Sequence, residues 1–123
     1  MKLTTEEFAE LVERALEEIP EPFEKHLQDV AIDIEPMPDL RTTRRMGLRS
    51  PRFLLGLYHG TPLTQRSVEH PYRLPDRITI YQRNIERICR THDEIIEQVR
   101  KTVLHEVGHH FGMEEGELRE LGY

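Results

Sequence analysis

Hydrophobic residues recur at helical spacing near both ends of the chain. Thr4 and Glu7 fit a capping box, in which each side chain accepts a hydrogen bond from the other residue's backbone at a helix start. The apolar positions that follow at helical spacing are Phe8, Leu11, Val12, Ala15, Leu16 and Ile19. A second, longer helix is predicted from Thr91, which repeats the capping box with Glu94. Its predicted core face contains Ile96, Val99, Val103, Val107 and a buried His110, with Phe111 just beyond.

Three shorter stretches between these helices are predicted strands. Residues 30–34 and 77–82 alternate apolar and polar side chains, which is typical of a half-buried strand. Residues 52–59 are almost continuously apolar, which favours a strand in the centre of a sheet. Two long helices combined with a few short strands predict an α+β fold.

The remaining segments are short helices and irregular connections. Residues 23–27 form a short predicted helix, and another is predicted from about Asn84, with a core side made of Ile85, Ile88 and Cys89. Residues 41–51 have no apolar periodicity and contain four arginines, so we expect a mobile basic loop that is either a solvated connection or a flap over a substrate. Residues 60–74 form a second predicted loop, which contains His70.

Length and composition fit a compact protein without membrane spans. A chain of 123 residues with 37% hydrophobic residues predicts a single domain over residues 1–123. No apolar run approaches the roughly 18 residues of a transmembrane helix, and the first residues lack a signal-peptide pattern. Cys89 is the sole cysteine, so no disulfide can form within the chain. We therefore expect a cytoplasmic protein with no membrane partner.

Charge is distributed unevenly along the chain, although the net charge is only −6. Residues 1–40 contain 12 acidic and 3 basic residues, whereas residues 41–100 contain 12 basic and 6 acidic ones. Two interpretations remain open: the charges balance each other within the folded protein, or the basic segment binds RNA or another anion. The arginines concerned are Arg41, Arg44, Arg45 and Arg49.

The sequence from His105 to His109 has the form H-E-x-x-H. On a helix, residues four apart lie one above the other on the same face, so His105 and His109 can bind one zinc ion. Glu106 points round the helix, where it can act as the general base that takes a proton from an attacking water molecule. The same residues could also form an ordinary polar surface.

The motif extends to H-E-x-x-H-x-x-G-x-x-E through Gly112 and Glu115. Composition alone would give the short motif with a probability of about 6%, but the extended one with a probability on the order of 0.1%. Gly112 is predicted to end the helix, so that the chain turns back and brings Glu115 to the zinc as a third ligand. The alternatives for this ligand are Glu114, Glu117, Glu120, His59 and His70.

These motifs resemble those of the zincin-like metallopeptidases, most closely a family of small bacterial single-domain members. The matching stretches are residues 54–58, 74–81 and 105–122. The resemblance implies a minimal zincin-like fold, with a small mixed sheet packed against an N-terminal helix and the long motif helix. It also implies that the strand at residues 77–82 pairs with an extended substrate. Glu115 departs from metzincins, which place His or Asp there, and their downstream methionine turn is missing.

The function expected from the motif is hydrolysis of peptide bonds in a peptide or protein substrate. Zinc would activate the water molecule, and Glu106 would transfer its proton to the leaving amine. Candidates for stabilising the oxyanion are Tyr81 and Tyr123. Two alternatives remain: a metal-dependent hydrolase acting on RNA, and a zincin-like binding module with weak or absent catalysis. The sequence does not predict the oligomeric state.

Overall fold

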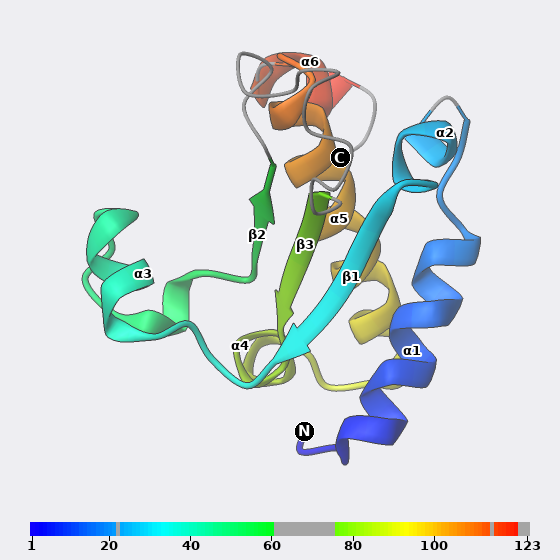
Figure 1. The fold of residues 1–123 in the computed structure, drawn as a ribbon. Helices are drawn as coiled ribbons and strands as arrows, with labels where there is room; N and C mark the ends of the chain where they lie inside the picture. Colours follow the sequence, from blue (N-terminus) through cyan, green and yellow to red (C-terminus); the bar gives the residue numbers. More distant parts are fainter. Residues whose placement is uncertain (22, 61–75, 114, 121–123) are drawn as a thin grey trace.

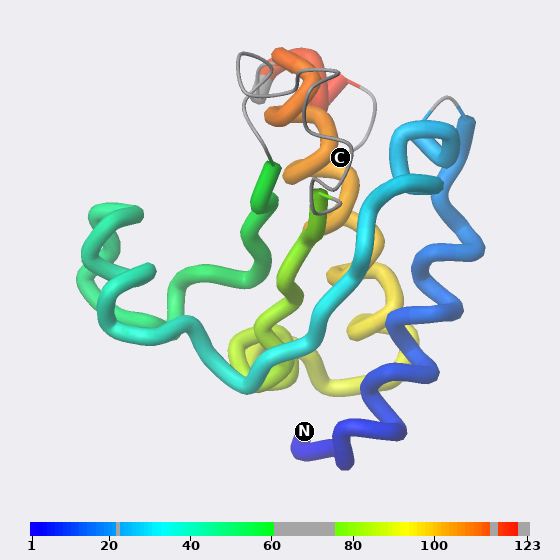
Figure 2. The backbone as a smooth tube through the Cα atoms, in the orientation of Figure 1, coloured from blue at the N-terminus to red at the C-terminus, as the bar shows by residue number. Residues whose placement is uncertain are grey.

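The structure, a computed structural model, describes residues 1–21, 23–60, 76–113 and 115–120, with only the backbone at position 115. Figure 2 traces the path of the backbone. In chain order, the elements are α1 (Thr5–Glu17), α2 (Phe23–Leu27), β1 (Val30–Glu35), α3 (Leu40–Arg45), the 3-10 helix η1 (Pro51–Phe53), β2 (Gly56–His59), β3 (Asp76–Tyr81), α4 (Gln82–Ile88), α5 (His92–His110) and α6 (Glu115–Glu120). This confirms the predicted α+β fold.

In the described part of the chain, the strands form a mixed sheet with the order β1-β3-β2. β1 runs parallel to β3 and β2 runs antiparallel to it, so the small mixed sheet is confirmed. The apolar segment at residues 52–59 was expected to form a central strand, and this was wrong: β2 lies at the edge and β3 is central. α5 packs against one face of β2, so the residues on that face are buried although the strand lies at the edge of the sheet.

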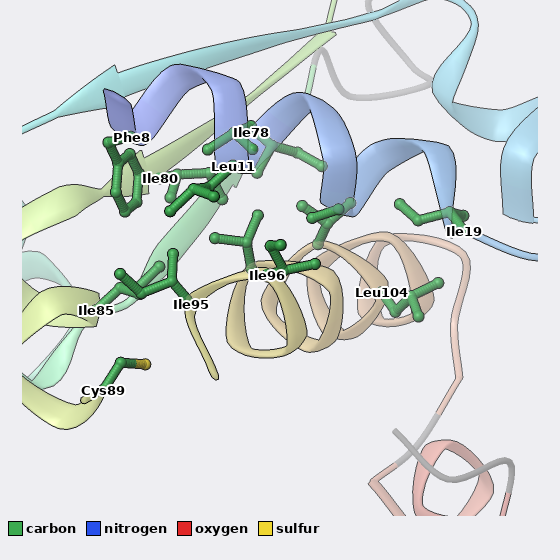
Figure 3. Packing of buried hydrophobic residues seen from close by; sticks show 14 of the residues in the cluster. Phe8, Leu11, Ile19, Ile78, Ile80, Ile85, Cys89, Ile95, Ile96 and Leu104 are labelled. Atoms are coloured by element: carbon green, nitrogen blue, oxygen red, sulfur yellow. The ribbon is translucent and has the colours of Figure 1, made fainter. Parts of the chain in front are cut away.

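The hydrophobic core lies between the sheet and two helices, α1 and α5, which cover the same face of the sheet (Figure 1). The predicted capping boxes at Thr4 and Thr91 are both present and start these helices. Figure 3 shows the α1 side chains pointing at α5, with Ile78 and Ile80 of β3 beside them. Phe8, Ile78 and Ile80 are completely buried. This packing fixes α5, which contains the motif, against the sheet.

The predicted basic loop is instead partly helical, because its polar residues form local hydrogen bonds. Asp39 caps α3: its Oδ1 accepts a hydrogen bond from the Thr42 backbone at 2.7 Å, and its carbonyl accepts one from the Thr43 hydroxyl at 2.8 Å. Pro51 then starts η1, so the strand predicted from residue 52 begins only at Gly56. Apolar periodicity could not detect α3, since its buried residue is Thr43.

The short helix α4 buries Ile85, as predicted, but it also buries polar side chains and leaves Ile88 on the surface, contrary to the prediction. Ile88 is 56% exposed, whereas Asn84 is 1% exposed. Asn84 is buried because its side-chain amide donates hydrogen bonds to the carbonyls of Pro51 and Leu54, at 2.7 and 2.6 Å. The prediction that Cys89 is buried is confirmed. α4 therefore anchors the segment that leads into β2.

The last turn of α5 is more exposed than its apolar pattern predicts. His110 is exposed rather than buried in the core, and Phe111 is 51% exposed. In Figure 1 this end of α5 lies beside α6. Phe111 instead contacts the His26 ring on α2, with a centroid distance of 4.0 Å. No helix within the described ranges is both long and apolar enough to cross a membrane.

Candidate active site

The motif occupies the last turns of α5, and the helix ends where Gly112 is predicted to end it. The Met113 amide donates to the Gly108 carbonyl at 2.8 Å, and the Gly112 amide donates to the His109 carbonyl at 3.1 Å. These two bonds form a Schellman motif, which requires a left-handed residue at the position of Gly112. Gly112 has φ of +84°, and glycine adopts this value without steric cost. The chain therefore turns back directly after the histidine pair.

His105 and His109 are neighbours on the helix surface, as their spacing predicts. Their ring centroids are 5.2 Å apart, and the rings meet edge to face. Two imidazoles that bind one tetrahedral zinc at about 2.0–2.1 Å have centroids about 5 Å apart. The spacing of the pair therefore fits a shared zinc ion.

Glu106 points toward β2 and is held there by the backbone of the strand. Its Oε1 accepts a hydrogen bond from the Tyr58 amide at 3.0 Å. Burial raises the pKa of the Glu106 carboxyl, and the Tyr58 hydrogen bond offsets only part of this effect. A carboxylate that is desolvated in this way is a stronger proton acceptor than an exposed one.

Tyr58 also links β2 to the residues around the motif. Its hydroxyl donates to Asp76 Oδ2 at 2.9 Å, and its ring stacks on His110 with a centroid distance of 4.0 Å. His110 Nε2 lies 3.8 Å from the same Asp76 oxygen. Residues from β2, β3 and α5 thus converge next to the candidate base. The sequence contains no signal for this cluster, because its members are far apart along the chain.

On the side opposite Glu106, the histidine pair is next to α6. Gly108 lies against Leu118, which is completely buried: an added Cβ at Gly108 would come within 2.5 Å of Leu118 Cδ2. At about 100° per residue, the pair lies between the Gly108 side of α5 and the Glu106 side. The histidines therefore lie between α6 and β2. This arrangement brings the start of α6 near the end of the motif.

The third ligand is not placed by the described residues. Among them, no group of three or more His, Cys, Asp or Glu side chains could hold a metal ion. The side chain of Glu115 lies outside the described part, as do Glu114, His70 and Tyr123. Glu117 and Glu120 lie on α6, and both are exposed. Glu115 remains a prediction from the spacing of the motif.

Two further candidates lie on the other face of the sheet. Side chains alternate along a strand, and Tyr58 packs against the core, so His59 must face away from α5. Burial is the main cause that lowers the pKa of His59, and the positive charges of Arg77 and Arg45 lower it further. Tyr81 follows Ile80, which points into the core, so Tyr81 also faces away from α5. Burial is the main cause that raises the pKa of Tyr81, and the negative charges of Glu35 and Asp39 raise it further. Neither side chain is brought to the histidine pair.

A pocket of about 350 Å³ lies between the start of β2 and α5. It is lined by Leu54, Leu55, Gly56, Gln98, Lys101, Thr102, His105 and Glu106. β2 and α5 come close there because position 56 is a glycine: an added Cβ would lie 2.6 Å from Thr102 Cγ2. Lys101 and Gln98 precede His105 by four and seven residues, so helical spacing alone could have identified them as its neighbours.

The arginines considered as an alternative RNA-binding segment are not part of this pocket lining. Arg41, Arg44 and Arg45 are exposed on α3, and Arg49 is exposed in the connection that follows. The basic residue that lines the pocket is Lys101. The geometry therefore does not connect the basic segment with the candidate base.

Comparison with known proteins agrees with the resemblance found in the sequence. Residues 27–123 match the family described as zincin-like metallopeptidase. A solved structure described as a conserved hypothetical protein from Thermo thermophilus is similar, with 33% sequence identity and a TM-score of 0.56. The similarity covers 88% of this chain and 94% of that chain. No curated protein matches the chain significantly. The family match spans more than half of the sequence, so the chain belongs to the zincin-like metallopeptidase family.

Proposed function

We propose that this protein is a zinc-dependent peptidase in which His105 and His109 hold the metal and Glu106 is the general base. The observation that carries the proposal is the pocket, because it is lined by His105, by Glu106 and by Gly56 of the edge strand β2. Glu115 is the proposed third ligand. Two imidazoles and a carboxylate are typical of catalytic zinc sites, whereas structural sites are closed by four ligands.

The edge strand offers a backbone surface for an extended substrate. In an antiparallel pair, successive residues alternately direct their backbone groups toward the partner strand and away from it. The Tyr58 amide binds Glu106, so the backbone groups of Tyr58 point away from β3, and those of Gly56 point the same way. The Leu55 carbonyl accepts from the Tyr81 amide at 3.0 Å, which fits this alternation. A peptide that pairs with Gly56 would therefore lie beside His105 and Glu106. We therefore propose β2 as the strand that pairs with an extended substrate, a role that was predicted for the strand at residues 77–82.

The position of Glu106 supports its proposed role as the general base. Bound zinc would supply a Lewis acid that polarises the substrate carbonyl and makes water a stronger nucleophile. Glu106 accepts the proton of the attacking water molecule and delivers it to the nitrogen of the leaving amine. The hydrogen bond from the Tyr58 amide keeps one carboxylate oxygen of Glu106 in place during both transfers.

The test is the Glu106→Gln substitution. We expect the variant to bind zinc with an affinity within about threefold of wild type and to lose at least about 100-fold in kcat/KM, the usual contribution of general base catalysis. Zinc affinity is measured by calorimetry on metal-stripped protein, and hydrolysis with a fluorogenic peptide library. Glu13→Gln, an exposed change on α1, is the matched control. Wild-type turnover in Glu106→Gln would exclude this residue as the base.

A further inference from the structure

We infer that the pocket selects substrates with a glutamate side chain and that Lys101 is the residue that recognises it. The inference rests on the proposed peptidase function and names the substrate class that the same site would take. It follows from the walls of the pocket, from the charge at its rim and from the direction of the neighbouring strand.

The walls favour a side chain with an aliphatic stem. Leu54 and Leu55 line the β2 side of the pocket, and Gly56 beside them adds no polar side chain. The volume of about 350 Å³ lies at the lower end of the range for small-ligand pockets, so the pocket has room for a substrate side chain. The Asn84 hydrogen bond to the Leu54 carbonyl fixes this wall on α4.

The rim supplies a positive charge that is only weakly compensated. Lys101 Nζ lies 3.8 Å from Glu97 Oε1, and both side chains are about half exposed. An exposed pair at this distance contributes little. Arg100 holds the same carboxylate more tightly, with hydrogen bonds of 2.6 and 3.2 Å. The Lys101 ammonium group thus keeps most of its capacity to attract an anion at its own end of the pocket, five residues along α5 from the Glu106 carboxylate.

The strand geometry brings a substrate side chain to this place. A peptide that pairs with the outward backbone groups of Gly56 directs alternate side chains to either side of its own strand. Those on the side of α5 meet Gln98, Lys101 and Thr102, which line the pocket one and two turns before His105. The two methylenes of glutamate can pack on the leucines while its carboxylate reaches the Lys101 ammonium group. A lysine in the same place would meet a like charge.

The experiment compares peptides that differ in a single residue, Glu, Gln, Leu or Lys, which is moved through successive positions of one parent peptide. Zinc-loaded wild type, Lys101→Met and Lys101→Glu are assayed for kcat/KM. The control is Lys25→Met, which removes an exposed lysine on α2. At one position, we expect wild type and Lys25→Met to prefer Glu over Lys by at least about tenfold. Lys101→Met should abolish this preference and Lys101→Glu should reverse it.

A binding assay separates this inference from the proposed function. Zinc-loaded Glu106→Gln, with and without Lys101→Glu, is titrated with the fluorescently labelled peptides, so that the preference is measured without turnover. If glutamate peptides bind through Lys101 and wild type cleaves none of them, the pocket assignment holds and the peptidase proposal fails. If wild type cleaves Glu and Lys peptides equally, or Lys101→Glu leaves the preference unchanged, the inference about Lys101 is wrong and the peptidase proposal stands. If peptides are neither bound nor cleaved, both are wrong.

Discussion

At the scale of single residues, Glu86 illustrates how a buried carboxylate can hold distant parts of this chain together. Its Oε2 accepts hydrogen bonds from the Leu3 amide and the Gln82 side chain, each at 2.9 Å, and its Oε1 accepts one from Arg83 at 2.7 Å. Glu86 is 3% exposed. These bonds fasten the residues before α1 to α4, and thereby help to fix the helix that packs on α5.

The pKa of Glu86 leads to a prediction about stability and pH. Burial alone would raise this pKa, but the hydrogen bonds from Gln82, Leu3 and Arg83 together outweigh burial and lower it. Because the folded pKa lies below the unfolded value of about 4.3, the carboxylate stabilises the fold above that pH. This contribution is lost as the pH falls through the folded pKa. Glu86→Gln should therefore cost about 1–3 kcal/mol at pH 7.

The measurement is urea unfolding of wild type and Glu86→Gln at pH 7 and at successively lower pH. The free-energy difference between the two proteins should shrink as the pH falls below about 4. Glu13→Gln, at an exposed position on α1, is the control and should change the stability by less than about 0.5 kcal/mol. A Glu86→Gln protein as stable as wild type at pH 7 would contradict the role given to this carboxylate.

At the scale of elements, the contact between α5 and α6 depends on a glycine inside the motif. Alanine in place of a mid-helix glycine normally stabilises a protein by about 0.5–1 kcal/mol. Here the added Cβ would lie 2.5 Å from Leu118 Cδ2 and 3.3 Å from its Cγ. Leu118 is completely buried, so it has little room to move. Overpacking of this kind costs about 1–3 kcal/mol, which outweighs the gain in helix propensity.

We therefore predict that Gly108→Ala destabilises the protein, by about 1 kcal/mol net. The shorter side chain in Leu118→Val should relieve the clash, so the double variant should be more stable than the sum of the two single effects predicts. Chemical unfolding of the four proteins gives this interaction energy directly. A Gly108→Ala protein that is more stable than wild type, or strictly additive effects, would show that α6 does not pack on Gly108 as described.

The elements that the sequence could predict are those that depend on local interactions. The capped helices α1 and α5 and the stop at Gly112 were predicted correctly, because each depends on residues within a few positions of one another. α3 was missed because it is held by the Asp39 cap and the Thr43 hydroxyl rather than by an apolar stripe. The order of β2 and β3 was exchanged because apolar content reports how far the faces of a strand are buried, and not how many strands it pairs with.

At the scale of the whole molecule, the candidate site is partly local and partly assembled by the fold. The histidine pair and Glu106 are on one helix, so their spacing alone predicted their mutual position. The Tyr58 amide that holds Glu106 comes from a strand 48 residues earlier in the chain, and no pattern in the sequence connects the two. The pocket likewise needs the segment that Asn84 anchors. Sequence therefore predicts the candidate residues, and tertiary packing supplies their surroundings.

Zinc should stabilise the whole molecule if the pair and Glu115 form the proposed centre. A ligand that binds only the folded state adds about 2.7 kcal/mol at a concentration 100 times its Kd. For a chain of 123 residues, this corresponds to a rise in Tm of about 10 °C. His105→Ala and His109→Ala should abolish the rise, and Glu115→Ala should reduce it. Glu106→Gln should retain it, because this residue contacts the Tyr58 amide and serves as the base rather than as a ligand.

Thermal unfolding of metal-stripped protein with increasing zinc tests this set of variants together. Glu13→Ala, an exposed change on α1, is the control for Glu115→Ala and should keep the full rise in Tm. Equal rises in wild type and Glu115→Ala would remove Glu115 from the site and leave the histidine pair with another third ligand. A rise that survives both histidine substitutions would mean that zinc binds elsewhere, and the proposed centre would be wrong. Because the measurement records folding rather than turnover, it establishes the metal site independently of any substrate.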